Sequence, residues 1–109
     1  MLAATPAVMS DVEYYLPDKQ STKKMADFFS AFSDPSRLRI LSVLAISPMC
    51  VTDVSQVLEM NQTTVSHQLR TLRDMGLVDF ERRGKIVFYK LSNQKINEIL
   101  LIGVEYLGY

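Results

Sequence analysis

The sequence predicts one mainly α-helical domain that carries a small β-hairpin, in the element order α-α-α-α-β-β-α. Three observations lead to this prediction. Apolar residues recur at helical spacing in several segments, a tight connection joins two short helices near the middle of the chain, and two β-prone runs flank a basic turn. Two short helices joined by about three residues form a helix-turn-helix, and the hairpin that follows adds a wing. The predicted class is therefore a winged helix-turn-helix.

Size and composition place the chain among small globular proteins. Its 109 residues match one domain, and 48% hydrophobic with 22% charged residues is ordinary for such a fold. No apolar run approaches the roughly 20 residues of a membrane-spanning helix, and the first ten residues lack the basic and apolar regions of a secretory signal. The single cysteine, Cys50, excludes an intramolecular disulfide and favours a reducing compartment. We expect a cytoplasmic protein with no membrane partner.

The charge is zero overall but unevenly distributed. Between Asn61 and Leu91 six basic residues face three acidic ones, which leaves +3 in that segment and −3 in the rest of the chain. A nucleic-acid surface needs such a local excess of positive charge. The predicted hairpin and the helix before it are therefore the candidate surface.

The chain divides into an arm, residues 1–18, and a folded domain, residues 19–109. The arm is slightly acidic, holds Pro6 and Pro17, and shows no sustained helical or strand period. Its Tyr14-Tyr15-Leu16 segment offers an apolar anchor to the body, so we do not expect the whole arm to be disordered.

The first two helices of the domain are predicted from their apolar faces. Between residues 20 and 32, four apolar side chains fall at i, i+3, i+4 and i+7. Asp34 then caps the next helix and Pro35 fits its first position, before Ser47-Pro48 ends it. The buried stripe expected on this second helix consists of Leu38, Leu41, Leu44 and Ala45.

The next two helices form the predicted helix-turn-helix. A short helix spans residues 51–58, with Val54, Val57 and Leu58 expected to face inward. Asn61 caps the following helix, which runs from Gln62 to about Met75, and Gly76 ends it in a left-handed conformation.

The wing and a last helix complete the domain. The strands are expected at 77–81 and 86–91, around the turn 82–85. Ser92 or Asn93 caps a helix that extends to about Leu107 and is apolar on nearly every side. A helix of this kind is usually buried on more than one side, so we expect a second subunit to cover it.

The fourth helix presents a polar face to solvent. Val65, Leu69 and Leu72 lie on one side of it and must face the core. Amides, hydroxyls, an imidazole and a guanidinium on the other side are the groups that read base edges in a major groove. We expect contacts to bases or flanking phosphates from Gln62, Thr63, Thr64, Ser66, His67 and Arg70. A simple solvated helix face is the alternative for this helix taken alone.

Other basic side chains are better suited to phosphates, which position a protein without reading sequence. Arg73, Arg82, Arg83 and Lys85 are expected to grip the DNA backbone or minor groove. Arg37 either touches a phosphate at the edge or forms a structural ion pair.

Three segments resemble those of one family. Segment 32–41, with its Asp34-Pro35 pair, is similar to the opening of ArsR/SmtB regulators, segment 65–73 to their recognition helix, and segment 76–91 to their wing. The resemblance covers about residues 25–91. It implies a homodimer joined through the first and last helices, and repression of an operator in double-stranded DNA that ends when an inducer binds.

The family's metal sites are not matched. The segment 49–53, where soft-metal sensors carry Cys-x-Cys, offers only Cys50. The positions of the zinc ligands on the last helix correspond to Asn93, Lys95, Tyr106 and Tyr109, none of which is a normal zinc ligand. We therefore expect no metal and no other cofactor, and the inducer stays unknown.

Cys50 and the wider function leave alternatives. The thiol is either a small apolar filler at a helix start or a redox sensor whose pKa the helix N-terminus lowers. An enzyme is not expected, because the chain lacks a phosphate-binding Gly loop, and its one His and one Cys lie on different predicted helices. A constitutive DNA binder of the same fold and a protein-binding winged helix remain the other interpretations.

Overall fold

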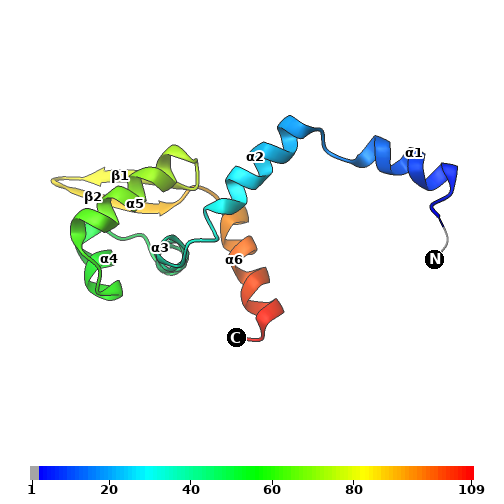
Figure 1. Cartoon of the computed structure of the whole chain (residues 1–109). Helices are drawn as coiled ribbons and strands as arrows, with labels where there is room; N and C mark the ends of the chain where they lie inside the picture. Colours follow the sequence, from blue (N-terminus) through cyan, green and yellow to red (C-terminus); the bar gives the residue numbers. More distant parts are fainter. Residues whose placement is uncertain (1–2) are drawn as a thin grey trace.

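The structure is a computed structural model that describes residues 3–109. Figure 1 shows a compact body from which one helical arm extends. The elements in chain order are α1 (Pro6–Tyr15), α2 (Lys19–Ser30), α3 (Pro35–Ile46), α4 (Val51–Leu58), α5 (Gln62–Asp74), β1 (Val78–Arg83), β2 (Ile86–Leu91) and α6 (Gln94–Leu107). The predicted winged helix-turn-helix is confirmed, with one helix more than the sequence indicated.

The hydrophobic core lies among α3, α4, α5 and the base of the wing. Its largest fully buried side chains come from α3 (Ile40, Leu41), α5 (Leu69, Leu72) and the start of the hairpin (Leu77). Burying each such side chain contributes about 1.5–3 kcal/mol to folding. The core thus fixes α5 relative to the hairpin.

Polar side chains set where the helices begin. A carboxylate oxygen of Asp34 accepts a hydrogen bond from the backbone N–H of Arg37 at 3.0 Å. The side-chain oxygen of Asn93 likewise accepts from the N–H of Lys95 at 2.9 Å, so Asn93, rather than Ser92, caps α6. The Ser92 hydroxyl instead donates to the carbonyl of Gly76 at 2.7 Å and ties the end of the wing to the end of α5.

The wing is longer and its turn tighter than the sequence indicated. Strands β1 and β2 pair antiparallel up to the pair Arg83–Ile86, so only Gly84 and Lys85 form the turn. Gly84 has φ +65°, a conformation that glycine adopts without a steric cost. Two hydrogen bonds between Met49 and Tyr89 add the segment before α4 to the hairpin. The hairpin is therefore anchored to the helix-turn-helix at its base.

Two predicted core positions are wrong. Leu38 on α3 is 38% exposed and Val57 on α4 is 56% exposed, whereas Ile40 and Val43 are buried in place of part of the expected α3 stripe. Apolar residues occur nearly all round α3, so spacing alone did not identify which side meets the core. Leu38 lies instead beside α6, on a surface that the protomer leaves open.

The arm contains a helix that the sequence prediction missed. The Thr5 hydroxyl accepts a hydrogen bond from the N–H of Val8 at 3.3 Å, and Pro6 occupies the first position of α1. No residue of α1 is buried, and Tyr14 and Tyr15 remain 81% and 77% exposed. The expected anchor of the arm on its own body is therefore absent from this protomer.

The protomer is unusually extended for its size. It measures 61 × 31 × 22 Å, with a radius of gyration of 18.4 Å. A compact chain of this length has a radius of gyration of about 13 Å. The accessible surface is 8285 Å², against about 6100 Å² expected for a compact monomer of 12.4 kDa. The elongation comes from α1 and α2, which form the arm seen in Figure 1. Neither helix buries a residue.

Within residues 3–109, no helix is long and apolar enough to cross a membrane.

Candidate nucleic-acid interface

The outer side of α5 is polar and accessible, as predicted. Val65, Leu69 and Leu72 are fully buried on the inner side. On the outer side, a shallow depression begins at Val51 of α4 and continues along the helix. Its α5 residues are Gln62, Thr63, Ser66, His67 and Arg70. The structure thus brings five of the six predicted base-reading residues together, and the sixth, Thr64, is exposed on the same helix.

Some polar side chains of α5 form hydrogen bonds within the helix. The Arg70 guanidinium donates to the Ser66 hydroxyl at a long 3.4 Å, so it lies along the helix toward its N-terminus. The Thr71 hydroxyl donates to the carbonyl of His67 at 3.1 Å and is therefore occupied. The polar groups available for base edges lie in the N-terminal part of α5, where helix-turn-helix proteins contact bases.

The turn before α5 is held by local hydrogen bonds. The side-chain oxygen of Asn61 accepts from the backbone N–H groups of Thr63 (2.8 Å) and Thr64 (3.4 Å). Glu59 reverses the chain with a left-handed backbone at φ 54° and ψ 44°. The buried Ser55 hydroxyl donates to the carbonyl of Met60. Sequence reasoning identified Asn61 but missed Ser55 and Glu59, whose residue types do not reveal these roles.

Arg73 lies at the junction between α5 and the wing. Its guanidinium carbon is 5.1 Å from the centre of the Phe80 ring on β1, and its Nη2 is 3.9 Å from a carboxylate oxygen of Asp74. The Arg73 side chain remains 40% exposed. It is therefore oriented by Phe80 while its charge still faces solvent.

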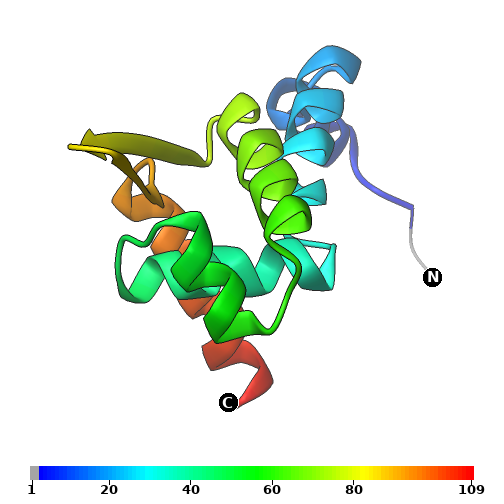
Figure 2. The same cartoon turned by 90° about the vertical axis from the view of Figure 1, so that its left-hand side faces the viewer.

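The tip of the wing carries exposed positive charge. Arg83 lies 3.4 Å from a carboxylate oxygen of Glu81 and 5.0 Å above the Phe88 ring. For Arg82 and Lys85, both exposed, the described part of the chain supplies no ion-pair partner. Figure 2 shows the hairpin extending beside α5. Positive charge at the wing and polar groups on α5 therefore belong to neighbouring parts of one body.

Arg37 lies outside the depression along α5, in the first turn of α3 and close to the end of α2. Its Nη2 donates to the carbonyl of Ser30 at 3.2 Å, and its Nε is buried without a hydrogen-bond partner among residues 3–109. This contact ties the end of α2 to the start of α3. A phosphate contact for Arg37 stays a prediction.

Cys50 is half-buried at the N-cap position of α4 and makes no capping hydrogen bond. It lines a shallow depression together with Thr52, Asp53 and residues of the wing, Lys85 among them. The thiol is thus accessible in part and lies near the wing.

The residues do not fit the metal sites that the family resemblance implies. Across residues 3–109, no three His, Cys, Asp or Glu side chains of one protomer come together. At the α6 positions, the Asn93 oxygen is used to cap the helix, and Tyr106 and Tyr109 are exposed phenols. No set of thiolates, imidazoles and carboxylates is available there for zinc.

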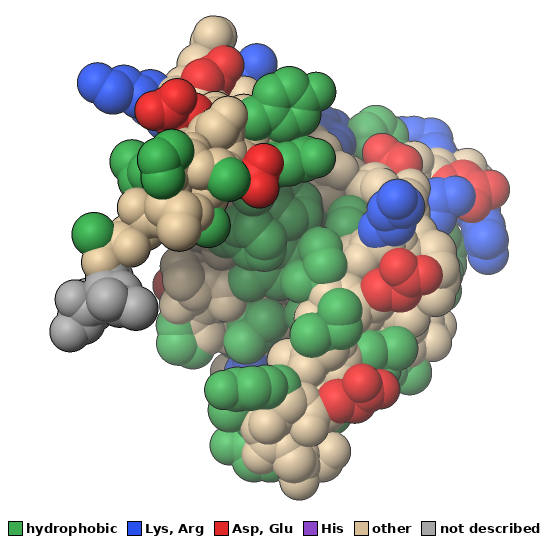
Figure 3. Space-filling view, turned by 90° about the vertical axis from the view of Figure 1, so that its right-hand side faces the viewer, with side chains coloured by type: hydrophobic (Ala, Val, Ile, Leu, Met, Phe, Trp, Pro, Cys, Tyr) green, Lys and Arg blue, Asp and Glu red, His purple; other side chains and the backbone are tan. Residues whose placement is uncertain are grey.

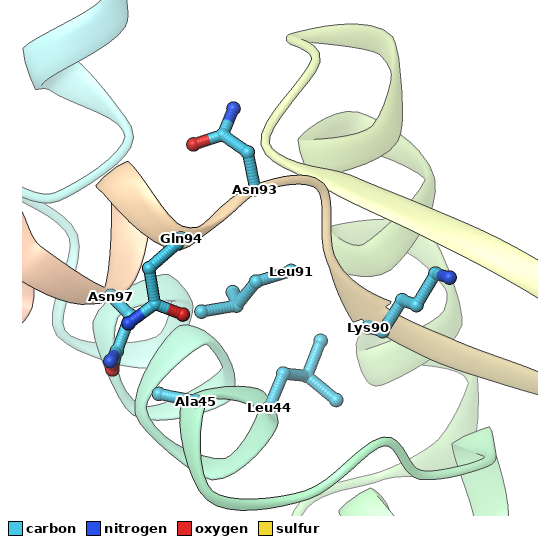
Figure 4. A pocket seen from close by; sticks show the side chains of 7 residues that line it. All are labelled: Leu44, Ala45, Lys90, Leu91, Asn93, Gln94 and Asn97. Atoms are coloured by element: carbon cyan, nitrogen blue, oxygen red, sulfur yellow. The ribbon is translucent and has the colours of Figure 1, made fainter.

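A third depression lies between α3, the end of β2 and the start of α6. Figure 4 shows Leu44 and Leu91 inside it, with the amides of Gln94 and Asn97 together at one edge and Asn93 turned away. Within the described chain, residues 3–109, Lys90 is the only charged residue that lines it. The depression is separate from the polar face of α5.

Comparisons with known proteins place the chain in a family. A family model described as "Bacterial regulatory protein, arsR family" matches residues 34–79. A transcriptional repressor SmtB homolog from Synechocystis is 45% identical over 68% of this chain and 56% of its own length. The regulator NmtR from Mycobacterium tuberculosis is 40% identical over 76% of this chain and 69% of its own length.

A solved structure is similar to this chain in fold. A homodimeric winged helix-turn-helix DNA-binding domain from Mycobacterium bovis has a TM-score of 0.73 at 25% identity, covering 86% of this chain and 88% of that one. The family model covers α3, α4 and α5, including the helix-turn-helix, and ends at the start of β1. The chain belongs to the ArsR/SmtB family of bacterial regulatory proteins.

Proposed function

We propose that the protein is a sequence-specific, DNA-binding transcriptional repressor. The observation that carries the proposal is the exposed polar face of α5 beside a wing whose Arg82 and Lys85 have no ion-pair partner within residues 3–109. The SmtB homolog is itself named a transcriptional repressor, and the family consists of regulators rather than enzymes. Because such a protein acts on chromosomal DNA, we propose a cytoplasmic location.

The geometry supports different roles for the residues of α5 and those of the wing. Gln62 is suited to a bidentate pair with adenine, Arg70 to one with guanine, and the threonine methyls to contact with thymine. Arg73 and the wing cations are suited to phosphates, which fix the register of α5 in the major groove.

We propose that the repressor is a homodimer joined through α2 and α6. Each protomer exposes about 2200 Å² more surface than a compact monomer of its mass. Two protomers would then bury about 4000 Å² in total, which lies within the range of obligate homodimers. α6 also leaves Leu101 and Ile102 exposed, both outside the depression that α6 forms with α3. The related domain from Mycobacterium bovis is described as homodimeric.

The signal is proposed to differ from that of the metal-responsive members. The residues at the usual ligand positions do not fit a metal, so we propose release by an inducer that is not a metal at those positions. If Zn²⁺, Cd²⁺ or Ni²⁺ at micromolar concentration released the DNA, this part of the proposal would be wrong.

Two other modes of regulation are compatible with a DNA-binding protein of this fold. One is constitutive binding without an inducer, and the other is release through oxidation of Cys50, which its partial exposure supports. Intact-mass analysis after mild peroxide, run beside DNA binding of a Cys50→Ser variant, separates them. Modification of the folded protein with loss of binding only in the parent chain supports the redox signal.

The direct test is fluorescence anisotropy of the purified protein with its own upstream intergenic DNA, in near-physiological salt and with unrelated DNA as competitor. Binding that resists the competitor is the expected result. Weak, competitor-sensitive binding to every intergenic fragment offered would instead favour a winged helix that binds protein.

A further inference from the structure

Helix α1 carries an apolar stripe that its own protomer does not cover. Val8, Met9 and Val12 fall on one side of the helix at about 100° per residue, and they are 49%, 50% and 48% exposed. An isolated helix of ten residues is marginal in water, because nucleation is costly and few hydrogen bonds repay it. Something must therefore cover the stripe for α1 to persist.

An apolar groove that could receive the apolar stripe of α1 lies between α3 and α6. Its principal lining residues are Leu38 and Ser42 of α3 and Leu100, Gly103, Val104 and Leu107 of α6, which together define the α3–α6 groove. Figure 3 shows hydrophobic side chains gathered in the hollow between the α1–α2 arm and α6.

Gly103 indicates that a backbone approaches this groove. Glycine in a helix interior is unfavourable relative to alanine. A Cβ added at Gly103 would meet nothing within 4 Å in the protomer, so the chain's own packing gives no reason for glycine there. A helix from outside the protomer supplies that reason, since small residues allow close helix crossings.

The protomer's own α1 does not occupy the groove. Figure 1 shows α1 beyond the far end of α2, away from the body. α2 and α3 are joined by only a few residues, and Arg37 ties the end of α2 to the start of α3. The arm is thus directed away from the body of its own chain.

We propose that α1 of each protomer docks through Val8, Met9 and Val12 into the α3–α6 groove of a second copy of this chain, so that the two arms clamp the dimer. This inference rests on the homodimer of the proposed function and assigns α1 a role that the α2–α6 interface does not include.

Charge favours a second copy over DNA as the occupant. Residues 3–18 carry Asp11, Glu13 and Asp18 and no Lys or Arg, so the arm repels phosphates. On α3, the exposed Arg39 is the neighbour in sequence of Leu38, which lines the groove. The carboxylates of α6, Glu98 and Glu105, lie at least about 140° round the helix from Gly103 and Leu107. Among residues 3–109, no Asp or Glu side chain lines the groove.

The test is a designed disulfide between α1 and the groove. In a Cys50→Ser background, Val12→Cys and Leu38→Cys are introduced into one chain, which is then oxidised with diamide and run on a non-reducing gel. The matched control pairs Leu38→Cys with Tyr14→Cys, because Tyr14 lies on the opposite side of α1. The expected result is a covalent dimer for the Val12 pair and much less for the Tyr14 pair.

Two results overturn the proposal: an intrachain disulfide in a covalent monomer, or no cross-link above the Tyr14 control. A second measurement guards against misfolding. Val8→Asp with Val12→Asp should raise the dimer dissociation constant roughly tenfold or more through lost apolar burial, whereas Ser10→Asp with Tyr14→Asp should change it less than about twofold. Equal effects of the two pairs contradict the docking.

A further measurement distinguishes failure of the arm docking from failure of the repressor proposal. It is the anisotropy of operator binding before oxidation, for the chain that carries Cys50→Ser, Val12→Cys and Leu38→Cys. Intact binding without the cross-link means that the arm docks elsewhere while the repressor proposal stands. Loss of binding in the unsubstituted chain as well means that the repressor proposal itself has failed.

Discussion

The guanidinium of Arg73, in the last turn of α5, lies 5.1 Å from the centre of the Phe80 ring on β1. This contact joins the recognition helix to the wing at their exposed junction. Leu72 and Leu77 are buried in one core cluster, so α5 and the segment that begins the wing share both a core and a surface contact. We infer that α5 and the wing move as one unit.

The Arg73–Phe80 contact should be measurable as a coupling energy. A double-mutant cycle with Arg73→Gln and Phe80→Leu, followed by urea unfolding, is expected to give a coupling of about 0.5–1 kcal/mol, as for exposed cation–π pairs. A coupling indistinguishable from zero would show that the two side chains are merely neighbours.

Arg70 and Arg82 should differ in how their loss affects DNA binding. Arg70→Ala is expected to cost about 1–3 kcal/mol on the operator and to relax preference at one base position. Arg82→Ala should weaken binding uniformly across sequences and reduce the salt slope by about one charge. Anisotropy titrations on operator and unrelated DNA at several salt concentrations distinguish these patterns. Identical effects of both substitutions would remove Arg70 from the base-reading set.

Loss of the Asn61 cap should destabilise α5 from its N-terminal end. Asn61→Ala removes the acceptor for the N–H groups of Thr63 and Thr64 and is expected to cost about 1 kcal/mol of folding free energy. Asn61→Ser keeps a capping oxygen and serves as the matched control. Equal stability of the alanine and serine variants in urea unfolding would contradict this role.

Asp18 should make the stability of α2 depend on pH in the acid range. The pKa of its carboxyl group is lowered from 3.8, mainly because the backbone N–H of Ser21 donates to it at 2.7 Å and the Ser21 hydroxyl adds to the effect. The stabilisation is therefore complete above the unfolded pKa and is lost as the pH falls through the folded one.

An NMR titration of the Asp18 carboxyl checks the direction of that shift. The expected midpoint lies below 3.8. Asp18→Asn, which keeps a capping oxygen but does not titrate, should abolish this part of the acid dependence of α2. A midpoint above 3.8 would contradict the hydrogen-bonded cap.

Local chemistry explains what the sequence could predict. Asp34, Asn61 and Gly76 act within a few residues of themselves, as two caps and a left-handed helix end, so the ends they set are visible in the chain. The inner side of α5 was also predictable, because its three buried residues recur at one helical spacing.

Features that depend on distant packing were not predictable in the same way. The exposure of Leu38 depends on α3 lying between the core and an open surface, and Val57 points away from a core that other helices define. The helix α1 escaped prediction because its apolar stripe is short and none of its residues is buried. Ser55 acts only because the chain reverses at Glu59.

The central claim, that a dimer reads DNA through α5, is tested most directly by selecting binding sites from a random DNA pool with the unmodified protein. The account predicts an enriched inverted repeat whose half-sites are centred about 10 base pairs apart, or a multiple of that spacing, because two α5 helices enter successive major grooves on one side of the duplex. Enrichment of no motif after repeated rounds, with the protein folded and dimeric, would contradict it.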